Sequence, residues 1–211
     1  MTKRSFLRTV GTRMTLLGAA AATTVPAIAA QSSEKSPYRA ARHSQDDWFD
    51  DIPGQHRLLF DTTESAGLSS ALLYSTNYYA ANQSSYGLQN SDLAVIIVVR
   101  HFSTPYAYND TIWSKYGTSL SKFIDANKEP SKTNTFLRQM NGATGRGVHF
   151  AVCAMATRAL AGSIARDANS TEDEIIKEIS ANLLPNSHLV PAGIVAVARA
   201  QERGYAFVHA R

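Results

Sequence analysis

Cysteine is nearly absent from this chain, and several familiar catalytic patterns are missing altogether. The 211 residues include one cysteine, Cys153, so no disulfide can form within the chain. There is no Gly-x-Ser-x-Gly elbow, no phosphate-binding loop and no paired-carboxylate set. The six histidines lack the close spacing of a metal site. We therefore predict no metal ion and no cofactor, and a thiol that is either buried and inert or reactive by purpose.

A strongly apolar run of about 20 residues, which a membrane-spanning helix needs, is also missing. Residues 1–30 instead have the three-part layout of a secretory signal: a basic segment at 3–8, a mildly apolar run at 14–30 and a small-x-small site at 27–29. The segment resembles a bacterial twin-arginine signal, with Lys3 in place of the first arginine. We expect a periplasmic or otherwise exported protein without a membrane partner once the signal is removed. Sec export or an uncleaved anchor is the alternative.

The mature chain has no excess of positive or negative charge. The full sequence has 21 basic and 17 acidic residues, and residues 1–30 hold four of the basic ones and no acidic one. The 21 basic residues less these four leave 17 against 17 in residues 31–211, a net charge of zero. Because no basic patch stands out, we predict no nucleic-acid partner.

Residues 31–53 are polar and lack an apolar period, which predicts a flexible linker or a loosely packed arm. Trp48 and Phe49 could dock this arm onto the domain or onto a neighbouring subunit. Residues 54–211 are long enough to form one domain with a full hydrophobic core.

Strands and helices alternate along this domain. The residues from 93 to 99 form a continuous apolar run, which is typical of a strand buried on both faces in a parallel sheet. Further strands are predicted at 56–61, 148–152, 189–190 and 205–208. Helices are predicted at about 65–82, 109–116, 135–141, 154–165, 171–182 and 191–203, and a glycine-rich loop at 142–147. The pattern predicts an α/β fold: a three-layer α/β/α sandwich with a mainly parallel sheet of about five strands.

Cys153 is the first candidate site residue, because it follows a predicted strand directly and stands at the start of a helix. The N-terminus of a helix carries partial positive charge, which favours the thiolate, and the thiolate is the nucleophile. Arg158, one turn further on, could add to this effect. The alternative is a small core cysteine packed under the sheet. His149, inside the same strand, is expected to be a satisfied core or face residue.

Arg100 and His101 end the most apolar strand and are the second candidate group. They suit an anion, a carboxylate or an oxidised sulfur species, and His101 could act as a general acid or base. Asn109, Asp110 and Trp113 could close over the same opening as binding residues. In the alternative reading, the strand ends in solvated residues and the aromatic side chains only pack a long loop.

The C-terminal third of the chain resembles the DsrE/DsrF-like family of sulfur-metabolism proteins. The resemblance rests on Gly-Val-His-Phe-Ala-Val-Cys at 147–153, Val-Pro-Ala-Gly-Ile-Val at 190–195 and Gly-Tyr-Ala-Phe-Val at 204–208. It implies a flavodoxin-like sandwich, assembly as a homotrimer or homohexamer, and a sulfurtransferase-like role. In that role Cys153 would carry sulfane sulfur as a persulfide between a donor and an acceptor protein. This chain departs from the family in its export signal and in a longer connection at 100–130.

The leading hypothesis from the sequence is therefore a periplasmic sulfur-handling protein, in which Arg100 and His101 hold an anionic sulfur species or tune the thiol of Cys153. The competing hypothesis is a non-catalytic binding or assembly module, with the aromatic loop at 106–116 in contact with a partner and Cys153 inert. A pocket for a small metabolite is a third alternative.

Overall fold

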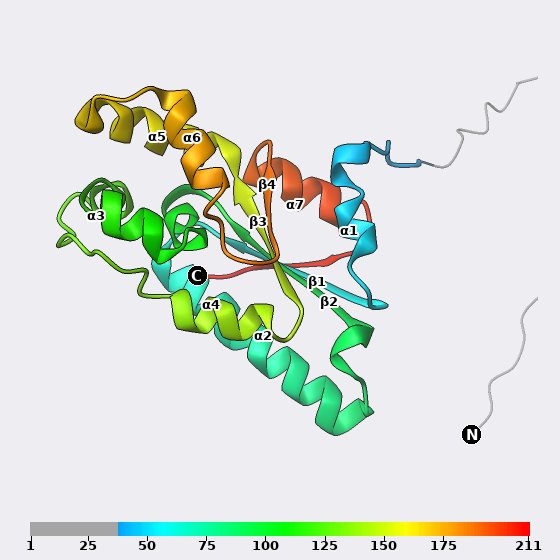
Figure 1. Ribbon diagram of the computed structural model, residues 1–211. Helices are drawn as coiled ribbons and strands as arrows, with labels where there is room; N and C mark the ends of the chain where they lie inside the picture. The colour runs from blue at the N-terminus through cyan, green and yellow to red at the C-terminus, as the bar shows by residue number, and fades with distance from the viewer. Residues whose placement is uncertain (1–37) are drawn as a thin grey trace, which may run out of the picture. The chain divides into compact units, whose positions relative to one another are not determined.

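Five parallel strands form the centre of the domain in the computed structural model, which describes residues 38–211 (Figure 1). The predicted signal peptide at residues 1–30 lies outside the described residues. The strands are β1 (His56–Thr62), β2 (Leu93–Val99), β3 (Val148–Cys153), β4 (Ser187–Val190) and β5 (Ala206–His209). Their order across the sheet is β4-β3-β2-β1-β5, and every pairing is parallel.

The central strand β2 explains why the sheet lies inside the domain. All seven of its residues, Leu-Ala-Val-Ile-Ile-Val-Val, are buried, and alternate side chains point into two separate apolar cores. β1 and β3 pair with β2 along nearly its whole length. The prediction of a strand buried on both faces is confirmed.

Helices cover both faces of the sheet, which confirms the three-layer α/β/α prediction (Figure 1). One face carries α2 (Ser65–Tyr86), α3 (Asp110–Ile124), α4 (Leu137–Thr144), α5 (Ala154–Ala168) and α6 (Glu172–Ser180). The other carries α1 (Trp48–Asp51) and α7 (Gly193–Gln201). Short 3-10 helices lie at Ser44–Asp46, Asn90–Asp92 and His101–Ala107.

The strand order accounts for this division of the helices. From β1 to β4 the chain crosses the sheet in one direction, and right-handed crossovers then place all the connecting helices on one face. The return from β4 to β5 runs the other way and places α7 on the opposite face. In the flavodoxin order β1 lies between β2 and β3, whereas here it lies between β2 and β5. The likeness to flavodoxin therefore extends to the layers and not to the strand order.

Some element boundaries differ from those expected. The helix expected at 109–116 continues to Ile124 through a kink at Tyr116, where φ is −120° and ψ is 15°. The last helix begins at Gly193 and not at Pro191, because Ala192 keeps an extended backbone. The first residues of the loop expected at 142–147 belong to α4. Thr171 forms the expected capping box with Glu174 at the start of α6.

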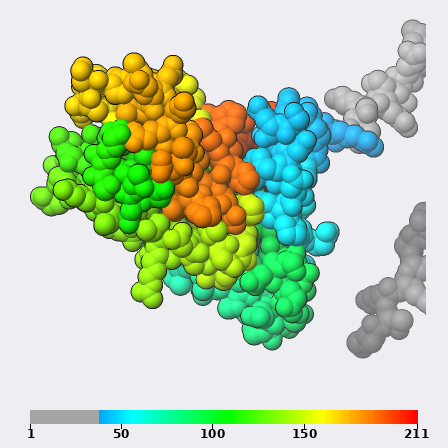
Figure 2. All heavy atoms as spheres, viewed as in Figure 1, coloured from blue at the N-terminus to red at the C-terminus, as the bar shows by residue number. Residues whose placement is uncertain are grey.

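Residues 40–53 of the arm belong to the same compact unit as the rest of the domain, and they pack against it (Figure 2). Phe49 is fully buried, and its backbone oxygen accepts a hydrogen bond of 2.7 Å from the Tyr205 hydroxyl. The Trp48 ring stacks on His188 with centroids 3.9 Å apart. The two aromatic residues thus dock the arm onto its own domain.

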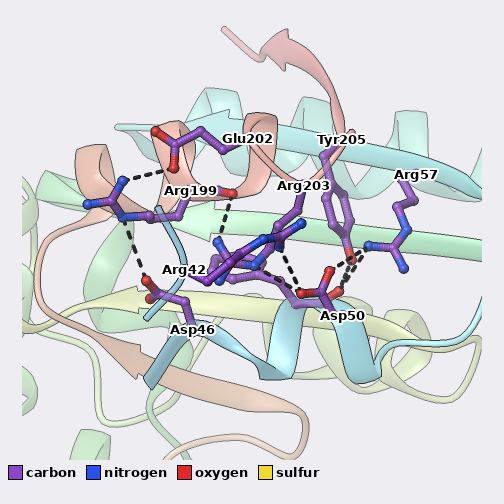
Figure 3. A network of polar contacts seen from close by, with 9 residues as sticks. Arg42, Asp46, Asp50, Arg57, Arg199, Glu202, Arg203 and Tyr205 are labelled. Carbon is purple, nitrogen blue, oxygen red and sulfur yellow. Dashed lines mark hydrogen bonds and ion pairs between the residues drawn. The ribbon is translucent and has the colours of Figure 1, made fainter. Parts of the chain in front are cut away.

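Ion pairs also fasten the arm to the domain (Figure 3). The Asp50 carboxylate accepts hydrogen bonds from Arg42, Arg57 and Arg203 at 3.0–3.3 Å. Asp46 lies 3.7 Å from the Arg199 guanidinium on α7. The Arg203 side chain is fully buried, and the carboxylate that pairs with it belongs to the arm. Without the arm in place, this buried guanidinium would lose that partner.

Candidate functional site

The carboxyl ends of β3 and β4 form the topological switch point of the sheet. β3 leads into α5 on one face, and β4 leads into α7 on the other. In open parallel sheets, ligands bind in the crevice that opens where neighbouring connections diverge in this way. A cavity of about 480 Å³ occupies this position, lined by residues 100–102, Phe123, four residues between 153 and 159, and residues 192–194.

Cys153 lies at the inner end of this cavity as the last residue of β3 and the N-cap of α5. Its side chain is a free thiol, and the residue is 7% exposed. The sulfur accepts a hydrogen bond from the backbone N–H of Ala156 at 3.5 Å. The thiol therefore faces an amide donor and the positive end of a four-turn helix, and it lies beside an open cavity instead of inside the core.

Arg100 lines the same cavity, but a carboxylate matches its charge. Nε and Nη2 donate to Oδ1 and Oδ2 of Asp61 at 2.7 and 2.8 Å, a bidentate pair with a buried partner. The hydrogen bonds to Asp61 raise the pKa of Arg100, and negative charge at Cys153 acts in the same direction. Nδ1 of His209 lies 3.2 Å from the same carboxylate. The Arg100 side chain is thus fixed near the thiol, and Asp61 has already neutralised it.

Gly193 makes room for this arginine. A Cβ atom at position 193 would lie 2.6 Å from Cβ of Arg100 and 2.9 Å from its Cδ. His101 follows Arg100, is exposed, lines the cavity and has a φ of 50°, in the left-handed region that non-glycine residues rarely occupy. The structure therefore brings together Cys153, Arg100 and His101, as the sequence predicted.

Trp113 and Arg158 do not line the cavity, which corrects the roles expected for them. The Trp113 side chain is fully buried, and Nε1 donates to the backbone oxygen of Pro105 at 3.1 Å. Trp113 belongs to α3, and its burial in the core leaves no surface for a ligand. The Arg158 side chain points to α6, where it pairs with Glu172 at 2.7 Å, and it is 62% exposed.

Asn109 and Asp110 also have structural partners away from the cavity. Oδ1 of Asn109 caps α3 by accepting from the N–H of Thr111 at 2.9 Å. A carboxylate oxygen of Asp110 accepts from the backbone N–H of Asn134 at 2.7 Å and fixes the following loop. The expectation that these residues close over the opening is corrected accordingly.

Sequence reasoning missed Asp61 and the apolar walls of the cavity. The sequence does give a signal for Asp61, because this acidic residue lies near the end of a buried strand. The walls include Phe102, Met155 and Ile194, which are 46%, 67% and 60% exposed. Large apolar side chains at this exposure, gathered around one opening, indicate a surface that contacts a ligand or a partner.

Two negative findings concern residues 38–211. Within this range no group of three or more His, Cys, Asp or Glu side chains is arranged to hold a metal ion. In the same range no helix is both long enough and apolar enough to cross a membrane.

Comparisons with known proteins add little to this geometry. No family model matches the chain, and no curated protein matches it. Among solved structures, a protein of unknown function from Methanobacterium thermoautotrophicum is similar at 17% sequence identity and a TM-score of 0.42. The match covers 74% of this chain and 99% of that one. A likeness at this level supports no conclusion about function.

Proposed function

We propose that this chain is an exported sulfur-handling protein in which Cys153 carries sulfane sulfur as a persulfide. The observation that carries the proposal is the position of the only cysteine: it opens into a cavity at the switch point of the sheet, beside an amide donor and the fixed guanidinium of Arg100. The resemblance to DsrE/DsrF-like proteins in residues 147–153 and 190–208, and the signal-like residues 1–30, support the same function and the periplasm as its place.

The transfer needs no oxidant. The Cys153 thiolate attacks the outer sulfur of a persulfide donor, R–S–SH, and a new sulfur–sulfur bond forms at Cys153. The bond between the two donor sulfurs breaks, and its electron pair leaves with R–S⁻, which then takes up a proton. Cys153 is left as Cys–S–SH. In this scheme Arg100, which Asp61 holds in place, tunes the thiol of Cys153, and His101 accepts or donates the proton at the mouth of the cavity.

A second candidate function is a non-catalytic binding or assembly module. It is favoured by the low exposure of Cys153, 7%, and by the apolar rim formed by Phe102, Met155 and Ile194. In that case the rim contacts another protein or a second copy of the chain in a homo-oligomer, and the thiol is only a small side chain beneath it.

The two functions are separated by intact-mass analysis of purified mature protein after incubation with an organic persulfide or with inorganic polysulfide. A sulfur carrier gains the mass of one sulfur atom, loses it on treatment with a reductant, and shows no gain in Cys153→Ala. Thiosulfate, incubated in parallel, tests the anionic donor expected from the sequence.

Alkylation of the thiol supplies the control. If native Cys153 reacts with iodoacetamide at a measurable rate but takes up no sulfur from any donor, the carrier function is wrong. If the thiol reacts with neither reagent until the protein is denatured, the assembly module becomes the better description. The oligomeric state of Ile194→Asp, compared with wild type by light scattering, then tests the rim as the interface.

A further inference from the structure

A second cavity, of about 560 Å³, lies between α2 and α4, and it shares no residue with the Cys153 cavity. The two helices lie side by side on the same face of the sheet (Figure 1). Leu72, Leu73 and Phe136 supply apolar surface, and Thr76 and Gln139 supply polar groups. The rest of the lining comes from two small residues and two arginines: Ser69, Gly142, Arg138 and Arg146.

These two arginines have no acidic counterpart. α2 has 22 residues and contains no charged side chain, and α4 contains only Arg138. Six of the eleven arginines in residues 38–211 form ion pairs: Arg42, Arg57, Arg100, Arg158, Arg199 and Arg203. Arg138 and Arg146 form none with any residue from 38 to 211. The cavity is therefore positively charged, and no carboxylate of the described chain competes for its two cations.

Arg146 is held in place and still has an unused donor. Its Nη2 donates to the Thr76 hydroxyl at 2.9 Å, which ties residue 146 to α2. Its Nε is buried and has no hydrogen-bond partner among the described residues. The neighbouring Tyr79 hydroxyl is also buried without a partner there.

The Tyr79 hydroxyl lies close to the backbone that follows Arg146. A Cβ atom on Gly147, the residue after Arg146, would lie 3.6 Å from the Tyr79 hydroxyl oxygen. Burial raises the pKa of Tyr79 to about 12, and the charge of Arg146 opposes this rise. Buried donors without partners are rare in folded proteins, because each costs the free energy of its lost hydration. Because both atoms are buried, a ligand in the cavity contacts the part of the Arg146 side chain that lines it and not these two atoms.

We propose that the cavity between α2 and α4 binds an organic anion, with a carboxylate or phosphate head group on Arg146 and Arg138 and an apolar body against Leu72, Leu73 and Phe136. The head group supplies the negative charge that the lining of the cavity lacks. The apolar body separates this ligand from a simple inorganic ion, because burial of aromatic or aliphatic surface adds to the binding. The site is independent of Cys153.

The test is titration of the ¹⁵N-labelled mature protein, followed by its amide and arginine Nε–H resonances. Four probes are compared: phenyl phosphate, benzoate, inorganic phosphate and benzyl alcohol. We expect saturable shifts at Thr76, Gly142 and the Arg146 Nε–H with phenyl phosphate or benzoate. Inorganic phosphate should bind at least tenfold more weakly, and the neutral alcohol should give no saturation. Comparison of the first two probes identifies the head group.

Three variants make the test specific. Arg146→Gln and Arg138→Gln should each raise the dissociation constant at least tenfold, whereas Arg166→Gln, an exposed arginine on α5, should leave it unchanged. Arg138 is exposed and makes no ion pair, so its variant remains informative if Arg146→Gln is unstable. The proposal is wrong if neither organic anion saturates these resonances, if benzyl alcohol shifts them equally, or if the Arg138 variant binds as the wild type does.

Discussion

Acid should loosen the docked arm through a pair of histidines beneath it. Nδ1 of His149 on β3 lies 2.9 Å from Nε2 of His188 on β4, and the indole of Trp48 stacks on His188. A hydrogen bond between two imidazoles requires that at least one ring be neutral. Burial, and then the charge of His149, lowers the pKa of His188 to about 4, and burial lowers the pKa of His149.

The direction of the effect follows from these pKa values. An unfolded histidine has a pKa near 6.5, so below that pH the unfolded chain binds a proton that the folded pair resists. The contribution of the neutral pair to the free energy of unfolding is therefore fully present above about pH 6.5 and is lost as the pH falls toward 4. Below pH 4 this contribution changes little. For a shift to about 4, the loss between pH 7.5 and pH 5 is about 2 kcal/mol. Because a ring with a pKa of about 4 is mostly neutral at pH 5, stacking of the indole on the protonated form changes this loss little.

Urea unfolding of wild type and His188→Gln at the two pH values measures this loss. Glutamine is neutral and can still form a hydrogen bond with His149, so the variant should lose about 2 kcal/mol less than wild type on acidification. His56→Gln, which replaces an exposed histidine, should behave as wild type. Equal losses in wild type and His188→Gln would refute the reasoning, because other titrating groups are common to both proteins.

Two further substitutions test the site and the arm. Asp61→Asn leaves the guanidinium of Arg100 without its carboxylate, and we expect it to lower the free energy of unfolding by about 3 kcal/mol; a loss below about 1 kcal/mol in urea unfolding would show that the pair is well solvated. Phe49→Ala removes a fully buried ring and should cost about 3–5 kcal/mol in the same assay. A cost below about 1 kcal/mol would mean that the arm is not part of the cooperative unit.

The layers of the fold could be predicted because they depend on local patterns. The unbroken apolar run of β2 indicates burial on both faces, and the regular spacing of apolar residues marks most helices. The extension of α3 to Ile124 could not be predicted in the same way. At Gly117 in this extension, a Cβ atom would overlap the backbone oxygen of Ser131, so the following loop packs closely against the helix there, and periodicity does not report such a contact.

The candidate site was predictable only where neighbouring strands end. Arg100 follows β2 and Cys153 ends β3, and because these strands pair directly, the meeting of the two residues follows from the topology. The pairing of Arg100 with Asp61 depends on β1 lying on the other side of β2, and strand order cannot be read from periodicity. Arg158 failed as a candidate for a related reason. Arg158 lies only about one helical turn after Cys153 in the sequence, but its side chain points outward to Glu172 on α6.

The charges around the two cavities decide which ligand each can take. At the Cys153 cavity, Asp61 forms two hydrogen bonds with Arg100, and the remaining walls are largely apolar, so a free anion gains little there. Between α2 and α4, by contrast, two arginines face a cavity with no acidic side chain. An anionic ligand therefore favours the second cavity. A sulfur donor for Cys153 should carry an apolar group that packs against Phe102, Met155 and Ile194, so an organic persulfide should load the thiol faster than thiosulfate does.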